Sequence, residues 1–293
     1  MRCFHEWGYS VLGVDRNAPP DDRLIQSDVA FEAVNLPDAR FRSLLREFRP
    51  ELVIHAAGCA MVGESLRDPL GDFHCNVEAT AFVLDQIRRT VPTARVALFS
   101  SAAVYGNPQT LPIAESFPLQ PLSPYGYHKW QCELLADEYA QLFEMRILVL
   151  RIFSAYGEGL RRQVVYDLCR KLRQVTDKIE ILGTGKETRD FIHGRDVALA
   201  IRVLHESNST GVFNVGSGEG TSIARLFGIL ADVLGAGKQA RYTGKVRTGD
   251  ALRWTADIGR LRALGFEPTV FFEAGIRRYA EWFLAQEAAV VDS

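Results

Sequence analysis

The sequence is poor in the residues that build disulfide frameworks and metal sites. It contains 5 cysteines and 6 histidines in 293 residues, and no two cysteines have C-x-x-C spacing. The histidines never stand at H-x-x-x-H or H-E-x-x-H spacing, the pattern by which a helix presents two ligands to zinc. We therefore predict no metal site. We also predict reduced thiols, in the core or on the surface, at Cys3, Cys59, Cys75, Cys132 and Cys169.

Two further absences exclude classes of partner. Basic and acidic residues nearly cancel, 34 against 36 for a net charge of -2, so the sequence has no electrostatic footprint for a nucleic-acid backbone. No apolar run approaches the roughly 18 residues that span a bilayer, and residues 1–8 lack the continuous apolar segment of a secretory signal. These features predict a cytoplasmic protein that binds neither nucleic acid nor membrane.

Short apolar runs rich in β-branched residues alternate with longer amphipathic stretches in the first half of the chain. The stretches Leu36–Phe48 and Asp68–Arg89 have helical spacing, and each is long enough to cross between two parallel strands. This alternation predicts an α/β fold with a doubly wound parallel sheet. The predicted buried strands are Tyr9–Val14, Glu51–His55, Ala94–Ser100 and Arg146–Ile152.

The second half of the chain has a looser pattern. We predict a helix near residues 164–174, a strand near 179–182 and a helix over 193–206. The glycine-dense turn at 216–220 precedes the amphipathic run 223–234, which indicates a helix capped by Thr221 or Ser222. No linker separates the halves, so we predict two lobes that share strands. We predict one domain over residues 1–153, with contributions from about 190–216, and a smaller mixed α/β lobe over residues 154–293.

An acidic residue ends the first predicted strand, in Gly13-Val14-Asp15-Arg16. A dinucleotide-binding fold places a carboxylate at this position to accept hydrogen bonds from the adenosine ribose, which favours NAD over NADP. The carboxylate follows a glycine-rich turn by about 20 residues in such folds. However, the 14 residues before Asp15 contain no G-x-x-G element. The first strand and its phosphate-binding loop are therefore missing from this sequence.

The missing strand has a physical cost. In the strand order 3-2-1-4-5-6 it lies in the middle, so its two neighbours lose hydrogen-bond partners, at about 1–3 kcal/mol for each unsatisfied buried group. A pyrophosphate also loses the amides and helix N-terminus that hold it. We therefore expect the sequence as written to bind a dinucleotide poorly. One explanation is a reading frame that starts too late, which we favour because the other motifs are intact; the other is true loss of the cofactor.

A tyrosine and a lysine stand one helical turn apart in Tyr125-Gly-Tyr-His-Lys129, and Pro124 suits the start of that helix. A nearby ammonium lowers the pKa of a phenol from its usual value of about 10, which makes the phenol useful as a general acid or base. Tyr-x-x-x-Lys pairs alone are usually surface residues. Here, however, two predicted strands end nearby in Ser100-Ser101 and in His55-Ala56-Ala57-Gly58, where α/β sheets bind ligands.

With these motifs the sequence resembles the extended short-chain dehydrogenase/reductase family of NAD-dependent nucleotide-sugar epimerases and dehydratases, from Trp7 to about Phe283. The resemblance implies a Rossmann-type sheet without its first strand and a smaller substrate lobe. The matching motifs, in order, are GVD at 13–15, HAAG at 55–58, SSAAVYG at 100–106, YGYHK at 125–129, RIFSAYG at 151–157, RDFIH at 189–193 and FNVGSGEG at 213–220.

The resemblance also implies roles for individual residues. Ser101, Tyr125 and Lys129 are the expected catalytic residues, and Asn76 helps to arrange the helix behind them. The expected NAD contacts are Asp15, Arg16, Asp28, Val29, Ala56, Ala57, Gly58, Asn76, Tyr125 and Lys129. The expected contacts to a nucleotide-diphosphate sugar are Ser154, Arg189 and Arg247. Both arginines suit phosphate oxygens as planar forks, although a surface salt bridge explains Arg247 equally well.

Two departures from the family pattern narrow the expected reaction. Ala102-Ala103 stand where nucleotide-sugar 4,6-dehydratases carry an Asp-Glu pair, and Ser154 replaces the asparagine of many epimerases. We therefore predict a UDP-hexose 4-epimerase that acts through a 4-keto intermediate. A 4-ketoreductase or dehydratase of the same family, or a catalytically silent nucleotide-sugar-binding paralogue, are the alternatives. The resemblance further suggests a homodimer through the helices at Asp68–Arg89 and Tyr125–Phe143.

Overall fold

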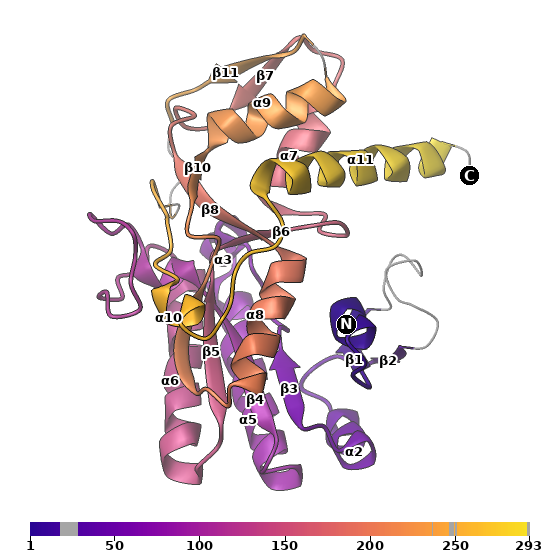
Figure 1. Ribbon diagram of the computed structural model, residues 1–293, viewed down its shortest axis with the longest axis vertical. Helices are drawn as coiled ribbons and strands as arrows, with labels where there is room; N and C mark the ends of the chain where they lie inside the picture. Colours follow the sequence, from indigo (N-terminus) through magenta and orange to yellow (C-terminus); the bar gives the residue numbers. More distant parts are fainter. Residues whose placement is uncertain (18–28, 236, 246–248, 250, 292–293) are drawn as a thin grey trace. The chain divides into compact units, whose positions relative to one another are not determined.

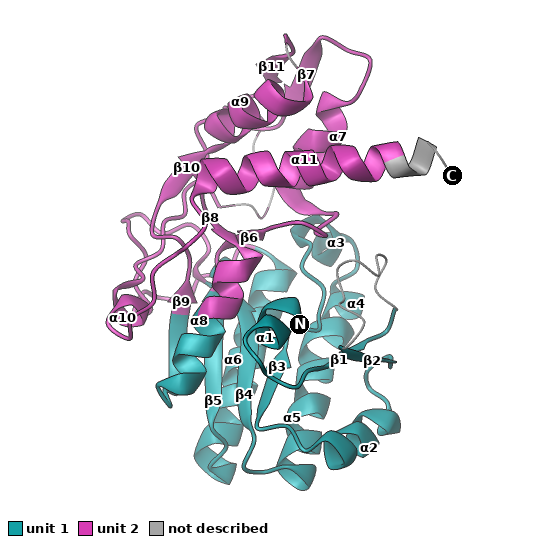
Figure 2. Cartoon of the chain, turned by 45° about the vertical axis from the view of Figure 1, so that its right-hand side comes forward, with its two compact units in different colours: residues 1–104, 123–151, 200–213 teal, residues 105–122, 152–199, 214–293 magenta. Residues whose placement is uncertain are grey.

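The computed structural model describes residues 1–17, 29–235, 237–245, 249 and 251–291, and it divides into two compact units (Figure 2). The first unit comprises residues 1–104, 123–151 and 200–213, and the second comprises 105–122, 152–199 and 214–293. Each unit has its own hydrophobic core. The chain passes between the units several times, and the predicted domain limits near residue 153 stay a prediction.

The first unit contains the parallel sheet that the alternation of strands and helices predicts (Figure 1). Its four strands lie in the order β3-β4-β5-β9, and β3 runs parallel to β4 with Leu52 opposite Arg95. A separate parallel pair is formed by β1 and β2, with Leu12 opposite Ala30. The strands are β1 (Leu12–Asp15), β2 (Ala30–Ala33), β3 (Leu52–His55), β4 (Arg95–Ser101), β5 (Ile147–Ile152) and β9 (Gly211–Val215).

The sheet is interrupted at the place where the sequence lacks a strand. Among the described residues β1 pairs with β2 and β3 pairs with β4, and no strand joins the two groups. The side chains of β3 reflect this, because Ile54 is 36 % exposed whereas every residue of β5 is buried. The doubly wound fold is therefore confirmed, and β3 has the exposure of an edge strand.

The core of the first unit lies between the sheet and three helices. The helices are α2 (Ala39–Phe48), α5 (Ala79–Thr90) and α6 (Pro124–Phe143). The Asp38 side chain caps α2 by accepting a hydrogen bond from the Arg40 amide at 2.7 Å. The apolar side chains that fill this core include Phe41, Leu45, Val83, Leu84, Ile87, Val96, Leu98, Ala136, Ile147 and Val149.

The helix that the spacing predicts over Asp68–Arg89 is present, and it contains a π-helical turn that the spacing did not indicate. It consists of α4 (Pro69–Phe73), the π-helical turn η2 (His74–Glu78) and α5. The Asp68 side chain caps α4 through the Gly71 amide at 2.9 Å. Asn76 then donates a side-chain hydrogen bond to the Asp72 carbonyl at 3.0 Å, within the wide turn. Wide turns of this kind are frequent at functional sites.

The start of α6 is confirmed where the sequence predicts it. Ser123 is the N-cap and accepts a hydrogen bond from the Gly126 amide at 3.3 Å, and Pro124 occupies the first turn. Glu144 ends the helix in a left-handed conformation with φ 53°. The cap and the proline fix where the helix begins, and hence which face Tyr125 and Lys129 share.

Two of the cysteines depart from the expectation of reduced thiols. Cys59 and Cys75 form a disulfide with a Cα–Cα distance of 5.8 Å. The prediction for these two residues was therefore wrong, because the fold brings the chain after β3 against η2 across 16 residues of sequence. Cys3, Cys132 and Cys169 are free thiols, and the last two are buried.

The second unit consists of two small sheets packed with helices. The three-stranded sheet has the order β10-β8-β6, and β11 pairs with β7 in parallel. Helix α9 spans the predicted range and is capped by Ser222, which accepts from the Arg225 amide. The strands are β6 (Ser154–Tyr156), β7 (Lys178–Ile181), β8 (Thr188–His193), β10 (Gly220–Ser222) and β11 (Gln239–Tyr242). The helices are α7 (Gln163–Leu172), α9 (Ile223–Leu234), α10 (Gly259–Arg262) and α11 (Phe272–Val291).

The remaining elements are α1 (Arg2–Glu6), α3 (Val62–Arg67), the 3-10 turn η3 (Ala102–Tyr105) and α8 (Gly194–Glu206). In the first unit α1 and the end of α8 are in contact, since the Arg202 guanidinium lies 4.7 Å from the centre of the Trp7 ring. Within the described ranges no helix is both long and apolar enough to cross a membrane.

Candidate active site

One face of α6 carries three buried polar residues, at intervals of four. Tyr125, Lys129 and Glu133 are all less than one-tenth exposed, although the first turn of α6 also bears the exposed Tyr127. Four-residue spacing places side chains on the same face of a helix. The helix therefore presents a phenol, an ammonium and a carboxylate in a row inside the first unit.

Lys129 is fixed against the end of strand β4. Its Nζ donates a hydrogen bond to the Phe99 carbonyl at 3.0 Å, and Ser101 follows Phe99 by two residues. The Ser101 Oγ accepts a hydrogen bond from the Ala103 amide at 3.2 Å. Burial lowers the pKa of the Lys129 ammonium, while the charges of Cys132 and Asp72 oppose that shift. The predicted serine and lysine thus come from elements that a hydrogen bond holds together.

Glu133, one turn after Lys129, also ties α6 to the sheet, through hydrogen bonds that the motifs did not reveal. Its carboxylate accepts hydrogen bonds from Arg151 Nε at 3.0 Å and Arg151 Nη2 at 2.7 Å, and from Ser100 Oγ at 2.5 Å. All three residues are buried. The contacts join α6 to strands β4 and β5. The spacing Tyr125, Lys129, Glu133 was the available sequence signal, since it continues the same helix face by one further turn.

The chain that follows β3 passes close to the Lys129 ammonium at Gly58. Gly58 has φ +148°, and a Cβ on it would lie 2.6 Å from Asn76 Oδ1 and 3.3 Å from Lys129 Nζ. Only glycine fits this position without displacing one of these groups. Asn76 Oδ1 is buried and has no hydrogen-bond partner among the described residues. The Asn76 Oδ1 acceptor and the Lys129 ammonium therefore both lie beside the backbone of Gly58.

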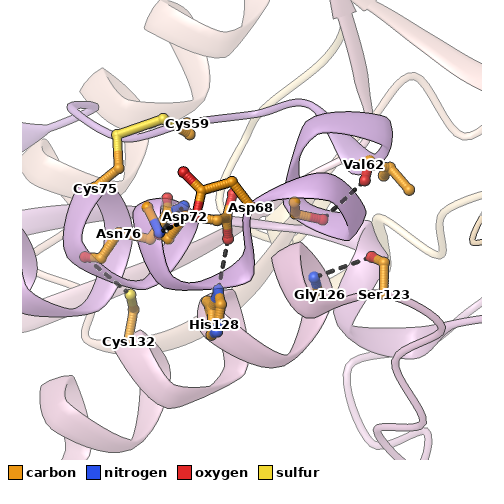
Figure 3. A network of polar contacts seen from close by, with 12 residues as sticks. Cys59, Val62, Asp68, Asp72, Cys75, Asn76, Ser123, Gly126, His128 and Cys132 are labelled. Carbon is orange, nitrogen blue, oxygen red and sulfur yellow. Dashed lines mark hydrogen bonds and ion pairs between the residues drawn. A yellow bond between two sulfur atoms is a disulfide. The ribbon is translucent and has the colours of Figure 1, made fainter.

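A second buried pair joins α6 to α4, the helix that directly precedes the turn with Asn76. His128 Nδ1 and Asp72 Oδ2 are 2.5 Å apart, and both side chains are buried (Figure 3). On the same side the Cys132 thiol donates to the Asn76 carbonyl at 3.4 Å. Hence α6 is bound to α4 through His128 and to η2 through Cys132, one helical turn further on, which fixes Asn76 relative to Lys129.

His55 is a buried histidine at the end of β3. Its Nε2 lies 3.1 Å from Thr80 Oγ1. Burial, aided by the positive charge of Lys129, lowers the pKa of His55 to about 3. The imidazole is therefore neutral at pH 7 and does not compete with Lys129 as a cation.

The other predicted cofactor contacts occupy varied surroundings in the first unit. Asp15 is exposed at the end of β1 and accepts a hydrogen bond from the Asn17 amide at 3.0 Å. Val29 is buried. Arg16, Ala56 and Ala57 are exposed. Asp28 lies outside the described residues. The carboxylate expected to hold a ribose is thus present on the surface.

Two predicted substrate contacts belong to the second unit. Ser154 begins β6 and pairs with Phe191 of β8. Arg189, in β8, donates to the Thr188 carbonyl at 3.0 Å, and its guanidinium lies 5.4 Å from the centre of the Trp254 ring. Arg247 lies outside the described residues. Both described side chains are half-buried.

Buried carboxylates in the second unit have structural roles. Asp190 accepts hydrogen bonds from the amides of Ser217, Gly218 and Ala256 and from the Ser217 hydroxyl, at 2.6–3.0 Å. Asp196 accepts from the Thr269 and Val270 amides and the Thr269 hydroxyl. These carboxylates hold loops in place. Within the described ranges no group of three or more His, Cys, Asp or Glu residues is arranged to hold a metal ion.

Comparison with known proteins identifies the family. Residues 1–216 match the family model described as NAD-dependent epimerase/dehydratase. The chain belongs to this family. It is 32 % identical over 288 residues to a UDP-glucose 4-epimerase of Corynebacterium glutamicum, with 90 % of this chain and 84 % of the relative covered.

Solved structures of epimerases share the fold. The Thermus thermophilus UDP-glucose 4-epimerase in complex with NAD superimposes with a TM-score of 0.87 at 28 % identity, covering 97 % of this chain and 94 % of the other. The Thermotoga maritima UDP-glucose 4-epimerase with UDP-glucose gives a TM-score of 0.86 at 27 % identity, covering 97 % and 94 %. The expected NAD-dependent epimerase/dehydratase membership and Rossmann-type fold are therefore confirmed.

The residues around Lys129 suit the NAD that this family uses. The side-chain-free surface at Gly58 and the unpartnered Asn76 Oδ1 offer room and an acceptor, and Asp15 offers a carboxylate. The described residues before β1 contain no glycine-rich loop, so the amides that would hold a pyrophosphate are not supplied by them.

Proposed function

We propose that this chain is an NAD-dependent 4-epimerase of a nucleotide-diphosphate hexose that acts through a 4-keto intermediate. The observation that carries the proposal is the hydrogen bond from Lys129 Nζ to the Phe99 carbonyl. It fixes the helix that bears Tyr125 against the strand that ends in Ser101. Family membership supports the use of NAD, and the relatives named above are UDP-glucose 4-epimerases.

In the proposed reaction Tyr125 removes the proton of the C4 hydroxyl as hydride leaves C4. Lys129 favours the phenolate through its charge, and Ser101 shares the proton by a hydrogen bond. Bound NAD accepts this hydride and, once reduced, would supply the same hydride to the opposite face of the ketone, which would invert C4. The phenol then returns its proton to the oxygen. The hydrogen bond to the Phe99 carbonyl holds Lys129 in place during both halves of the cycle.

The turn after β4 argues against a 4,6-dehydratase. Ala102 and Ala103, which replace the Asp-Glu pair of such enzymes, are both buried. Neither methyl group can act as an acid or base for removing water across C5 and C6. The local structure therefore favours epimerisation, with 4-ketoreduction as the related alternative.

A second candidate is a nucleotide-sugar-binding protein without redox turnover. The observation that favours it is that, among the described residues, no strand joins the β1–β2 pair to the four-stranded sheet. Such a protein would bind the sugar nucleotide through Ser154, Arg189 and Arg247 and would bind NAD weakly.

We also propose that the chain forms a homodimer through the helices at residues 68–89 and 125–143. These helices expose large apolar side chains, with Leu70 64 % exposed, Tyr127 49 % and Leu134 56 %. Exposed apolar surface of this kind marks interaction sites. Light scattering during size-exclusion chromatography tests the proposal. A mass of one chain at micromolar concentration would contradict it, and Leu134→Glu should shift a dimer to monomer.

Substrate conversion tests the main proposal. The 293-residue protein is incubated with NAD and, separately, with UDP-glucose and UDP-N-acetylglucosamine, and the products are separated by anion-exchange chromatography. We expect the corresponding 4-epimer to form with at least one substrate. With substrate deuterated at C4, we expect the product to keep the deuterium, because the hydride returns to the same carbon. Loss of the deuterium to water would contradict this mechanism.

The same samples distinguish the alternatives. A 4-ketoreductase would give a net change in NADH absorbance that an epimerase does not give. Calorimetric binding of a UDP-sugar with no conversion in the presence of saturating NAD would favour the silent binding protein. Our expectation of poor dinucleotide binding predicts that conversion requires a high concentration of added NAD, and full activity at low NAD would contradict that expectation.

A further inference from the structure

The Cys59–Cys75 disulfide joins a segment without regular secondary structure to a helical turn (Figure 3). Cys59 lies in residues 56–61, which form no helix or strand between β3 and α3. Cys75 lies in the π-helical turn η2. The disulfide therefore ties an irregular segment to an element with regular backbone hydrogen bonds.

The turn that carries Cys75 is held independently of the disulfide. Asn76 donates to the Asp72 carbonyl, Cys132 donates to the Asn76 carbonyl, and His128 pairs with Asp72. These contacts fix η2 on α4 and α6. Breaking the sulfur–sulfur bond would leave η2 in place and release the segment on the Cys59 side.

The disulfide lies directly beside groups of the proposed active site. Cys59 follows Gly58, and Cys75 precedes Asn76. Gly58 in turn passes so close to Asn76 Oδ1 and Lys129 Nζ that a side chain on it would press against both. Movement of Cys59 would therefore also displace its neighbour Gly58, which lies beside the Lys129 ammonium.

Both sulfur-bearing residues are half-buried, whereas the free thiols of Cys132 and Cys169 are buried. Thiol–disulfide exchange requires access of an attacking thiolate to one sulfur. The Cys59–Cys75 bond thus has the partial exposure that exchange needs. Disulfides in reducing compartments are generally transient and often redox-sensing.

We infer that Cys59 and Cys75 form a reversible redox catch that orders residues 56–61 and thereby sets the affinity of Ala56, Ala57 and Gly58 for NAD. In the oxidising direction the two thiols react with one molecule of a small disulfide such as oxidised glutathione, giving the protein disulfide and two small thiols. A dithiol reverses the reaction and is itself oxidised to a disulfide. The effect on NAD rests on the cofactor contacts of the proposed function.

Thiol mapping tests whether the catch forms. The protein is equilibrated with oxidised or reduced glutathione, free thiols are alkylated with iodoacetamide, and peptides are identified by mass after reduction and labelling with N-ethylmaleimide. We expect Cys59 and Cys75 to exchange labels together between the two conditions. Cys3→Ser is the matched control because Cys3 is a free thiol in the same unit. Full alkylation of both cysteines under the oxidising condition would overturn the inference.

Hydrogen exchange tests the consequence for the chain without relying on activity. We expect amides of residues 56–61 to exchange about tenfold faster in the reduced protein than in the oxidised protein, while those of η2 stay protected. The double variant Cys59→Ser/Cys75→Ser should match the reduced protein under both conditions. Equal exchange in the two redox states would overturn the inference.

Fluorescence titration with NADH measures the effect on the cofactor. A pre-ordered segment loses less freedom on binding, so we expect the oxidised protein to bind about 3- to 10-fold more tightly than the reduced protein or the double variant. Equal affinities would overturn the stated control of NAD binding. Redox-dependent exchange with no NADH binding in either state would count against the cofactor contacts of the proposed function and not against the catch itself.

Discussion

Two buried carboxylates of the second unit and a buried ammonium of the first unit differ in how far hydrogen bonds satisfy them. In the second unit Asp190 and Asp196 each receive at least three hydrogen bonds, mainly from backbone amides of neighbouring loops. In the first unit Lys129 has three donors and one hydrogen bond, to Phe99, among the described contacts. The nearby Asn76 Oδ1 has no partner there.

This difference separates structural from chemical use of a buried polar group. A carboxylate saturated by amides stabilises the loops that it holds, and it has no remaining capacity for a ligand. A buried ammonium or amide oxygen that lacks hydrogen-bond partners lowers the stability of the fold unless a ligand supplies those hydrogen bonds. We therefore expect substitutions near Lys129 and Asn76 to affect turnover more than stability, and substitutions of Asp190 and Asp196 to do the reverse.

The largest expected effect is on turnover. Tyr125→Phe removes the proposed acid/base, so kcat for epimerisation should fall by about 10²- to 10⁴-fold with little change in thermal stability. Tyr127→Phe, on the exposed side of the same helix turn, is the matched control and should keep full activity. Initial rates measured at saturating substrate decide the matter. A Tyr125→Phe enzyme with near-normal kcat would remove the proposed role of the phenol.

The next effect should be on stability alone. Asp190→Ala leaves the half-buried amides of Ser217 and Gly218 and the buried amide of Ala256 without their acceptor, which should cost about 3–5 kcal/mol of unfolding free energy. Urea denaturation followed by circular dichroism measures this loss. Asp232→Ala is the control, because the Asp232 carboxylate is exposed and makes only a surface ion pair with Arg277. A loss below about 1 kcal/mol for Asp190→Ala would contradict the proposed structural role.

A smaller effect depends on pH and comes from His55. Its pKa of about 3 in the folded protein lies below the unfolded value near 6.5, so the unfolded state binds the proton first as the pH falls. Stability is therefore lost on acidification, by about 3 kcal/mol between pH 6.5 and pH 4.

Comparison with variants isolates this contribution from that of the carboxylates. The unfolding free energy of His55→Gln should fall less steeply between pH 6.5 and pH 4 than that of the natural sequence. The control is His74→Gln, because His74 is exposed. It should leave the slope of the natural sequence almost unchanged. Parallel pH curves for all three proteins would show that His55 is not buried as a neutral group.

The smallest effect comes from two matched helix caps. Ser123 caps α6 and Ser222 caps α9 by the same type of hydrogen bond. Each change to alanine should cost about 1 kcal/mol of stability. Only Ser123→Ala should also lower kcat, because its helix begins with Tyr125. Thermal unfolding and initial rates measured on both variants test this, and an equal effect on kcat would erase the distinction between the two units.

Local patterns predicted much of the first unit. The strand before Ser101 and the cap before Tyr125 are where they were expected, because apolar runs and cap residues act over a few neighbouring positions. The pattern did not reveal the π-helical turn within 68–89, whose wide geometry depends on the contact between Asn76 and Asp72. It also missed β2, a short strand with one charged and three apolar residues.

The roles of the predicted site residues are proposals, and only some of their surroundings were predictable. The four-residue spacing of Tyr125 and Lys129 predicts a shared helix face. It does not predict that the ammonium binds the Phe99 carbonyl or that Gly58 passes beside it. The disulfide between Cys59 and Cys75 was missed for a related reason, because nothing in a spacing of 16 residues requires two sulfurs to meet.

The sequence by itself determined the parallel α/β fold, the family and the order of the motifs, because periodicity, caps and turns are properties of consecutive residues. Tertiary structure alone decided which polar groups are satisfied and which retain capacity for a ligand. Asp190 and Lys129 each carry an ionisable side chain that is buried in the fold. Only the packing of distant segments around them, loop amides in one unit and Gly58 with Asn76 in the other, makes the first a structural anchor and the second a candidate for catalysis.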